Sequence, residues 1–339
     1  MGKTKIFCIG VVLLVLGLAA WVSTLNFIPN ISYRYRVQLD TPGGPLPFRI
    51  DAYRPDNRGA WSAVVRIGEG FHDAGNLERI SVEMTGAWND FEVRFPHYDS
   101  VLKLKADSNS GDFKGSWIKN RGDGNVAIMN ALAIRDSTVP LFDTIDDSNF
   151  LMDFAGRWSV DFELSDQLAI GKFDVDDQQN ASATFLTTTG DYRYLAGRVD
   201  GNLMRLSTFD GAHAFLFHAR MQDDGTIEGD FWSGNWHHET WTATRDDDAA
   251  LPDAFKQTTI ADEDALDDMV FKNLQGEPTR VLDLLDESNA NARIIEIFGT
   301  WCPNCSDAAR ELVSLKEQYG DDLAVVGLAF EIVEDFERS

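Results

Sequence analysis

Cysteine is scarce in this chain of 339 residues, which carries three. Cys8 lies inside an apolar run near the N-terminus, and the other two form a single Cys-x-x-Cys pair, Cys302 and Cys305. A framework of structural disulfides, which supports many small secreted domains, is therefore excluded. An exported protein that keeps one close pair of cysteines uses them more often for chemistry than for bracing.

Basic residues are also few, with 30 lysines and arginines against 55 acidic residues and a formal net charge of −25. Such a surface repels phosphate backbones, so we expect no nucleic acid partner. Apolar residues make up 44% of the chain, which is enough to bury a core. The length is more than one ordinary domain needs, so we expect a multidomain protein.

An uncharged, apolar run spans residues 6–22 and follows Lys3 and Lys5. Positive charge before the run and none directly after it predicts a cytoplasmic N-terminus with the remainder exported. The run is slightly shorter than the roughly 20 residues that cross a bilayer, but apolar residues just beyond it extend it. We expect residues 1–30 to be an uncleaved anchor of a single-pass membrane protein with a periplasmic bulk. The alternative is a signal peptide whose cleavage releases the protein into the periplasm.

Residues 31–245 alternate between apolar and polar with period two, as in 91–95 and 101–105. This pattern is typical of antiparallel strands with one buried face. Asp-Gly pairs at 200–201, 210–211 and 224–225 punctuate the strands, and Asp-Gly between alternating runs indicates a hairpin turn. We therefore expect an all-β barrel or sandwich. A break in the alternation at 136–149 marks a candidate boundary within it.

Gly156-Arg157-Trp158 and the strands after it resemble the opening of a lipocalin-type barrel. We expect the β-rich region to be a packed spacer that holds the C-terminal redox unit off the membrane; the alternative, which the resemblance implies, is a barrel that binds a ligand or a partner. His237 and His238 are adjacent on a predicted strand, so they face opposite sides and are poorly placed to share a metal ion. We expect no metal and no cofactor.

An acidic linker, residues 246–260, ends the β pattern, and the last unit covers 261–339. An apolar strand at 293–298 leads into the Cys-x-x-Cys, which a helical pattern at 306–319 and a second apolar strand at 323–330 follow. This order predicts a β-α-β unit with the cysteines where the first strand meets the helix.

The position of the cysteines at the start of a helix suits thiol chemistry. A helix N-terminus stabilises a thiolate, so we expect a lowered pKa for Cys302, which would attack a partner disulfide. Pro303 suits the first helical position because it has no N–H to lose. Cys305, one turn further on, would resolve the mixed disulfide. A zinc site would need two more ligands nearby, and a covalent haem site would need histidine where Ser306 stands.

Trp301-Cys302-Pro303-Asn304-Cys305, preceded by an apolar strand and by the hairpin-like segment 271–278, resembles the TlpA/ResA-type thioredoxin-like proteins of the AhpC/TSA–redoxin superfamily. The resemblance covers 271–331. It implies an α/β thioredoxin-like fold, with Trp301 and Pro303 supporting the motif. It also implies protein disulfides as substrates and a membrane electron donor. Glu296 falls where thioredoxin carries a buried acid, which suggests a proton carrier for Cys305; the alternative is a solvent-facing acid.

The resemblance also shows a departure, because no proline follows Pro303 and few residues remain for the rest of a thioredoxin fold. The expected fold is thus an N-terminal membrane helix, an antiparallel all-β middle region and an incomplete thioredoxin-like unit. The expected function is an extracytoplasmic thiol–disulfide oxidoreductase. One alternative is a peroxiredoxin-like peroxidase, although Gly299 stands where its Thr or Ser would be. The other is a ligand- or partner-binding β-barrel protein with a degenerate redox unit.

Overall fold

The computed structural model describes residues 30–54, 62–67, 78–87, 89–122, 124–135, 140–145, 152–257, 259, 268–286 and 290–330. The predicted membrane anchor or signal peptide, residues 1–30, lies outside these ranges except for its last residue. In the ranges described, no helix is both long enough and apolar enough to cross a bilayer.

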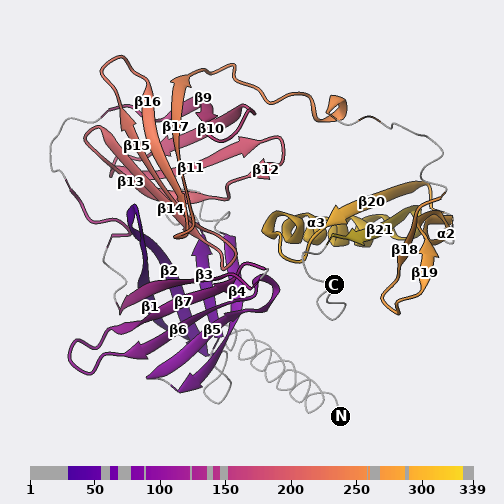
Figure 1. Cartoon of the computed structure of the whole chain (residues 1–339), viewed down its shortest axis with the longest axis horizontal. Helices are drawn as coiled ribbons and strands as arrows, with labels where there is room; N and C mark the ends of the chain where they lie inside the picture. Colours follow the sequence, from indigo (N-terminus) through magenta and orange to yellow (C-terminus); the bar gives the residue numbers. More distant parts are fainter. Residues whose placement is uncertain are drawn as a thin grey trace, which may run out of the picture.

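The first barrel is a closed sheet of eight antiparallel strands in up-and-down order (Figure 1). The strands are β1 (Asn30–Thr41), β2 (Gly44–Arg54), β3 (Ser62–Ile67), β4 (Glu78–Ala87), β5 (Asp90–Phe95), β6 (Ser100–Ala106), β7 (Phe113–Asn120) and β8 (Val126–Arg135), with a 3-10 turn, η1 (Pro96–Tyr98), after β5. Residues 35–39 of β1 pair with 131–135 of β8 and close the barrel. The predicted alternation is confirmed in β5, where Phe91, Val93 and Phe95 are buried and the residues between them are not.

The second barrel follows the same up-and-down order. Its strands are β9 (Gly156–Phe162), β10 (Ala169–Val175), β11 (Asn180–Thr187), β12 (Gly190–Asp191), β13 (Leu195–Asp200), β14 (Leu203–Phe209), β15 (Ala214–Met221), β16 (Ile227–Ser233) and β17 (His237–Arg245). β9 pairs with β10 and β17, and β10 also pairs with β11, so the sheet closes on itself with the short β12 beside β11. The break at 136–149 falls between the two barrels.

The three predicted Asp-Gly turns are confirmed, and all three lie in the second barrel. Gly201, Gly211 and Gly225 have φ angles of 62°, 89° and 84° and connect β13 to β14, β14 to β15, and β15 to β16. These turns require a positive φ angle, which glycine adopts at no steric cost. The turns therefore set the order of the strands that carry the candidate site.

Trp158 of the Gly-x-Trp pattern lies at the joint between the first and last strands of the second barrel. Its indole is buried, and Nε1 donates a 2.9 Å hydrogen bond to the carbonyl of Phe154. The guanidinium of Arg245, at the end of β17, lies 4.6 Å from the centre of the Trp158 ring. Arg245 also donates to two backbone carbonyls just before β9. These contacts hold the two ends of the sheet together.

Phe209, at the end of β14, joins the barrels by inserting into the core of the first. Its ring stacks on Phe48 at 4.1 Å and meets Trp117 edge-on at 5.2 Å. Ser207 Oγ donates to the carbonyl of Pro47 at 2.6 Å, so a hydrogen bond also joins the two barrels. The barrels are consequently joined by a buried interface as well as by the chain that connects them.

The C-terminal arm, residues 268–330, is a small α/β unit beside the barrels (Figure 1). Its elements are β18 (Val270–Lys272), β19 (Pro278–Arg280), α2 (Val281–Asp286), β20 (Ala292–Phe298), α3 (Pro303–Tyr319), the 3-10 turn η3 (Gly320–Asp322) and β21 (Leu323–Ala329); a further 3-10 turn, η2 (Ala254–Lys256), precedes it. β20 and β21 pair in parallel, as the β-α-β pattern predicts. The hydrophobic cluster here is small, with Val281, Leu285 and Ala324 buried.

The predicted thioredoxin-like fold is wrong. In the described part of the arm, the sheet that carries the Cys-x-x-Cys has two strands, and β18 and β19 form a separate hairpin. The chain is instead nearly all β, with two closed barrels. The strand–helix–strand pattern is encoded by neighbouring residues, whereas a fold also depends on which distant strands join it. Here strands β1–β17 pair within the two barrels, and none of them joins the sheet of β20 and β21.

Replacing Phe209 with alanine tests the joint between the barrels. We expect Phe209→Ala to lower the free energy of unfolding by about 3–5 kcal/mol, because it removes a fully buried ring and leaves a cavity. Urea denaturation followed by tryptophan fluorescence measures the change. Phe255→Ala is the matched control, since that ring is 95% exposed, and it should change stability by less than about 0.5 kcal/mol. Equal effects of the two substitutions would contradict this account of the interface.

Candidate functional site

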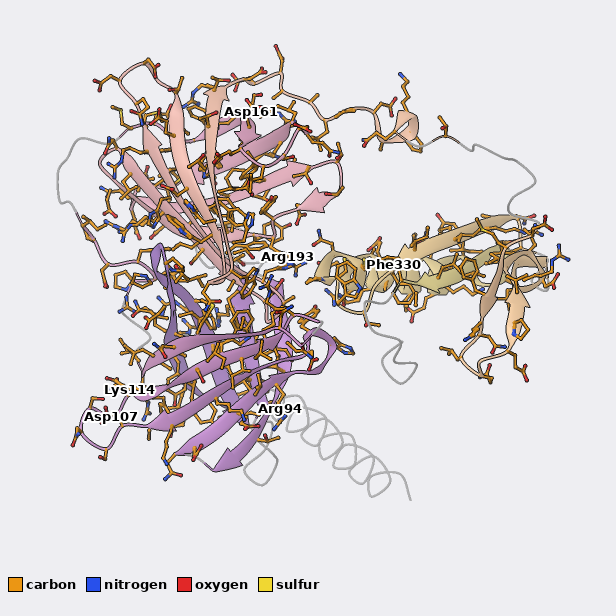
Figure 2. The ribbon with its side chains drawn as sticks, viewed as in Figure 1. Arg94, Asp107, Lys114, Asp161, Arg193 and Phe330 are labelled. Atoms are coloured by element: carbon orange, nitrogen blue, oxygen red, sulfur yellow. The ribbon has the colours of Figure 1, made fainter. Side chains whose placement is uncertain are left out.

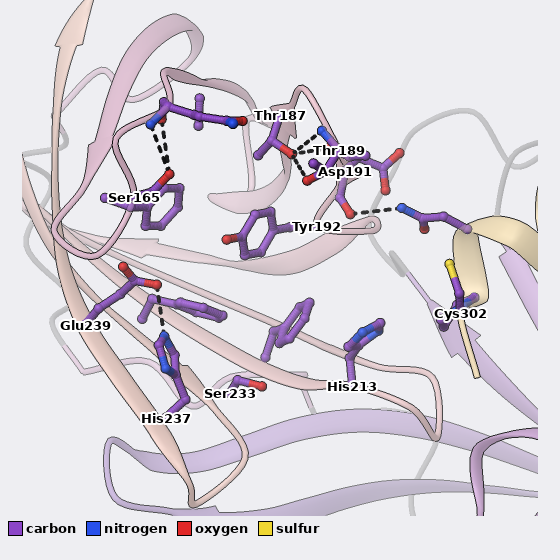
Figure 3. Close-up of a pocket in the computed structure, with 18 of the residues that line it drawn as sticks. Ser165, Thr187, Thr189, Asp191, Tyr192, His213, Ser233, His237, Glu239 and Cys302 are labelled. Atoms are coloured by element: carbon purple, nitrogen blue, oxygen red, sulfur yellow. Dashed lines mark hydrogen bonds and ion pairs between the residues drawn. The ribbon is translucent and has the colours of Figure 1, made fainter. Parts of the chain in front are cut away.

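A cavity of about 630 Å³ opens at one end of the second barrel, and we call it the mouth cavity (Figure 3). Strands β9, β10, β11, β12, β15, β16 and β17 contribute to its wall, and the start of α3 closes one side. A cavity of this size suits a small organic molecule. The barrel supplies most of the lining, and the C-terminal arm supplies residues 301–304.

Four aromatic rings that contact one another line the mouth cavity, Phe162, Tyr192, Phe215 and Phe231, and Trp236 and Trp301 line it as well. Tyr192 stacks on Phe162 with ring centres 5.5 Å apart and planes 10° from parallel. Its ring also lies 5.5 Å from Phe215 and 5.4 Å from Phe231. The rings hold one another in place, so the cavity has a preformed aromatic floor.

Glu239 provides a buried carboxylate at this floor. It is 7% exposed, and its Oε1 lies 2.9 Å from Nε2 of His237. Figure 3 marks this contact with a dashed line. Oε2 accepts a 3.1 Å hydrogen bond from the backbone N–H of Leu164. The carboxylate also affects the hydroxyl of Tyr192. Burial is the larger cause and the negative charge of Glu239 the smaller one, and together they raise the pKa of Tyr192 to about 12. Among the described residues, none hydrogen-bonds the Tyr192 hydroxyl, which leaves this donor for a ligand.

A buried arginine connects the barrel to the C-terminal arm. Arg193 lies in the loop between β12 and β13 and faces the arm (Figure 2). Its guanidinium is 3.4 Å from Asp210 Oδ2 inside the barrel and 2.5 Å from Asp307 Oδ2 on α3. Burial alone would raise the pKa of Asp210, but His213 and Arg193 outweigh it, and the pKa is lowered. The arm is therefore held at the mouth cavity by an ion pair between the buried Arg193 and the partly exposed Asp307.

Cys302 and Cys305 lie at the start of α3, on the side of the mouth cavity that the arm closes. The local prediction is confirmed: Cys302 is the N-cap, Pro303 begins the helix, and the backbone N–H of Cys305 donates to Cys302 Sγ at 3.3 Å. The two sulfurs are 2.6 Å apart and both residues are free cysteines. No pattern in the sequence predicted that Cys302 would face a cavity of the barrel.

The expected activation of Cys302 is wrong. Burial, followed by the hydrogen bond shared with Cys305, raises the pKa of Cys302 to about 11. The hydrogen bond from the Cys305 N–H acts in the opposite direction but is the smaller effect. A thiol with this pKa is almost entirely protonated near neutral pH, so it is a poor nucleophile.

The other predicted site residues occupy supporting positions. Trp301 is 41% exposed, and its Nε1 donates to the carbonyl of Phe330 at 3.0 Å. Glu296 is half-buried on β20, opposite Gly327 of β21. Within the described residues, no hydrogen bond or ion pair links Glu296 to either cysteine, and its role as a proton carrier stays a prediction. His237 faces the mouth cavity, and His238 pairs with Asp230 at 2.8 Å.

Sequence analysis missed Glu239 and Tyr192. A signal for Glu239 was present, because Glu239, Trp241 and Ala243 share the buried face of β17 and an acid on that face is out of place. Tyr192 had no such signal, since it lies in the short stretch between β12 and β13, outside any alternating run.

No protein-family model matches the chain, and no curated protein matches it. One solved structure that matches is a protein of unknown function from the DUF3598 family of Nostoc punctiforme, with 9% identity, 64% of this chain and 96% of that chain covered, and a TM-score of 0.20. Another is a candidate outer membrane protein from Bacteroides fragilis, with 11% identity, 62% and 94% covered, and a TM-score of 0.19. Scores this low do not establish a shared fold.

The predicted thiol–disulfide oxidoreductase function and the resemblance to TlpA/ResA-type proteins are therefore corrected. No redoxin family model matches, and the described arm does not build a thioredoxin-like sheet. The peroxidase alternative needs that same fold and loses the same support. The alternative of a ligand-binding β-barrel protein agrees better with a chain made mainly of two barrels, one of which has a lined cavity.

Alkylation of Cys302 tests whether its thiol is unreactive. At pH 8 a thiol with a pKa of about 11 is ionised about 100-fold less than one at the ordinary value of 9.0. We expect iodoacetamide to react about 10- to 100-fold more slowly with Cys302 than with free cysteine, since the stronger nucleophilicity of its thiolate offsets part of the loss. Site-resolved mass spectrometry across pH 7 to about 11 gives the profile.

The variant Cys305→Ala serves as the comparison for this measurement. It removes the shared hydrogen bond, so the alkylation profile of Cys302 should move to lower pH. A profile of the unaltered protein with its midpoint below the ordinary thiol value would contradict the burial of this group.

Proposed function

We propose that this protein binds a small molecule in the mouth cavity of its second barrel. The observation that carries the proposal is the combination of a preformed aromatic floor with a buried carboxylate and a tyrosine hydroxyl that converge on one cavity. Sites for small ligands have this composition, with mostly apolar walls and a few polar groups that fix orientation. If residues 1–30 direct export, as their charge pattern predicts, the ligand is met outside the cytoplasm.

The first barrel has a supporting role in this proposal. Its interior is filled by side chains such as Phe48, Phe113 and Trp117, which are buried in one continuous core. An eight-stranded barrel is just wide enough for side chains to fill its interior. It serves as the base on which the second barrel is mounted.

The neutral fluorescent probe N-phenyl-1-naphthylamine tests the proposal. We expect saturable fluorescence enhancement with the whole protein, because the aromatic floor offers the probe an apolar site. Ser233→Trp, which places a large ring into the cavity, should weaken binding by about tenfold or more. Ser110→Trp on the exposed β6–β7 turn is the matched control and should leave binding unchanged.

Circular dichroism checks that both tryptophan variants keep the barrels. Probe binding that does not saturate, or that Ser233→Trp leaves intact, would show that the mouth cavity is not a ligand site.

A further inference from the structure

The buried carboxylates of the described residues differ in one respect, which is the presence of a permanent positive charge beside them. Four are buried: Asp51, Asp200, Asp210 and Glu239. The first three pair with arginines: Asp51 with Arg34 and Arg66, Asp200 with Arg198 and Arg205, and Asp210 with Arg193. Glu239 has no arginine or lysine within ion-pair distance in the described ranges, and its ionic contact is with His237.

This difference has a physical cost. A carboxylate removed from water needs a compensating charge or a full set of hydrogen bonds. Histidine supplies a positive charge only in its protonated form. A carboxylate accepts about four hydrogen bonds, and Glu239 receives one from the Leu164 N–H and a contact from His237. Since Glu239 lines the mouth cavity, a ligand can provide the positive charge and the remaining hydrogen bonds that the protein does not supply.

The rings beside Glu239 suit the same kind of partner. Aromatic faces carry negative electrostatic potential and attract ammonium groups that approach within about 6 Å of the ring centre. Phe231 pairs with Glu239 across β16 and β17, and the Phe231 ring lies 5.7 Å from the His237 ring. Tyr192 lies 5.4 Å from Phe231 and stacks on Phe162, and all three rings line the same cavity as Glu239. A carboxylate next to aromatic faces forms a binding environment for a positively charged organic group.

The surroundings favour an organic cation over a bare metal ion. In the described part of the chain, no group of three histidine, cysteine or acidic side chains is close enough to hold a metal. The cavity of about 630 Å³ also leaves space for an attached body. The formal charge of −25 attracts cations from solution. Arg121 also lines the cavity, but it is exposed and rests against Trp236, 4.6 Å from the ring centre.

We propose that the ligand of the mouth cavity is an organic cation, an ammonium group on an apolar or aromatic body. The ammonium group lies against Glu239 and the body lies on the aromatic floor. The proposal rests on the proposed function, because it names the class of molecule that the same cavity takes.

Competition against N-phenyl-1-naphthylamine separates the two proposals. Three small competitors share a benzyl or phenyl body and differ in charge: benzyltrimethylammonium, benzyl alcohol and benzoate. We expect the cation to displace the probe at concentrations at least about tenfold lower than benzyl alcohol, with benzoate the weakest. This comparison uses the unaltered protein, so it does not depend on how any variant folds.

Glu239→Gln tests the residue directly. We expect it to remove most of the preference for the cation, measured in the same variant as the ratio of the displacing concentrations of benzyl alcohol and of the cation, a loss of about tenfold or more. Glu163→Gln is the matched control, since Glu163 is exposed and bonds Thr240 outside the cavity. His237→Gln should keep the preference, because it leaves the carboxylate in place. A merely structural role of the Glu239–His237 contact would make both cavity variants behave alike.

The outcomes separate as follows. A protein that binds the probe but takes benzyl alcohol or benzoate as well as the cation overturns the organic-cation proposal and leaves the ligand site standing. A preference that survives Glu239→Gln also overturns it. Absence of saturable probe binding overturns the ligand site, and the organic-cation proposal falls with it.

Discussion

Closure of the second barrel by the pairing of β9 with β17 is the contact on which the candidate site depends. The register places Phe162 opposite Trp241 and Trp158 opposite Arg245, so the two strands meet along residues 158–162 and 241–245. Closure removes the open edges of the sheet. It also brings Phe162 from the first strand and Glu239 from the last to the same end of the barrel, although they are far apart in sequence. Without this pairing there is a twisted sheet but no cavity.

The two ends of the second barrel have different chemistry because its interior side chains change along the strands. The end away from the mouth cavity holds Trp158 and Phe173, whose ring centres lie 6.3 Å apart in the buried core. The mouth end holds Tyr192, His237 and Glu239, which bring polar atoms to the edge of an aromatic floor. Dense packing at one end gives the barrel its stability, and the polar end is free to serve binding. A single alternating pattern thus produces both a core and a site.

Much of the fold was predictable from local patterns. Alternation in residues such as 91–95 and the Asp-Gly pairs gave strands and turns that the structure confirms. The same local logic gave the β-α-β unit around Cys302. It failed for the fold of the arm, because a Cys-x-x-Cys at a helix start does not specify which other strands surround it. It also failed for the pKa of Cys302, since the burial and the sulfur contact that raise it depend on packing as well as on the helix N-terminus. Glu239 was visible only as an acid on a buried face, and its cavity required the closed barrel.

The insertion of Phe209 into the first barrel has a consequence for how this chain can be divided. The ring belongs to the second barrel by sequence and to the core of the first by position. Cutting the chain between the barrels would expose the Phe209 ring on the second barrel. It would also leave an unfilled space in the core of the first barrel. Each half on its own would therefore expose apolar surface that the intact chain buries, and joining one barrel to an unrelated domain would require a new side chain to fill the space left by Phe209.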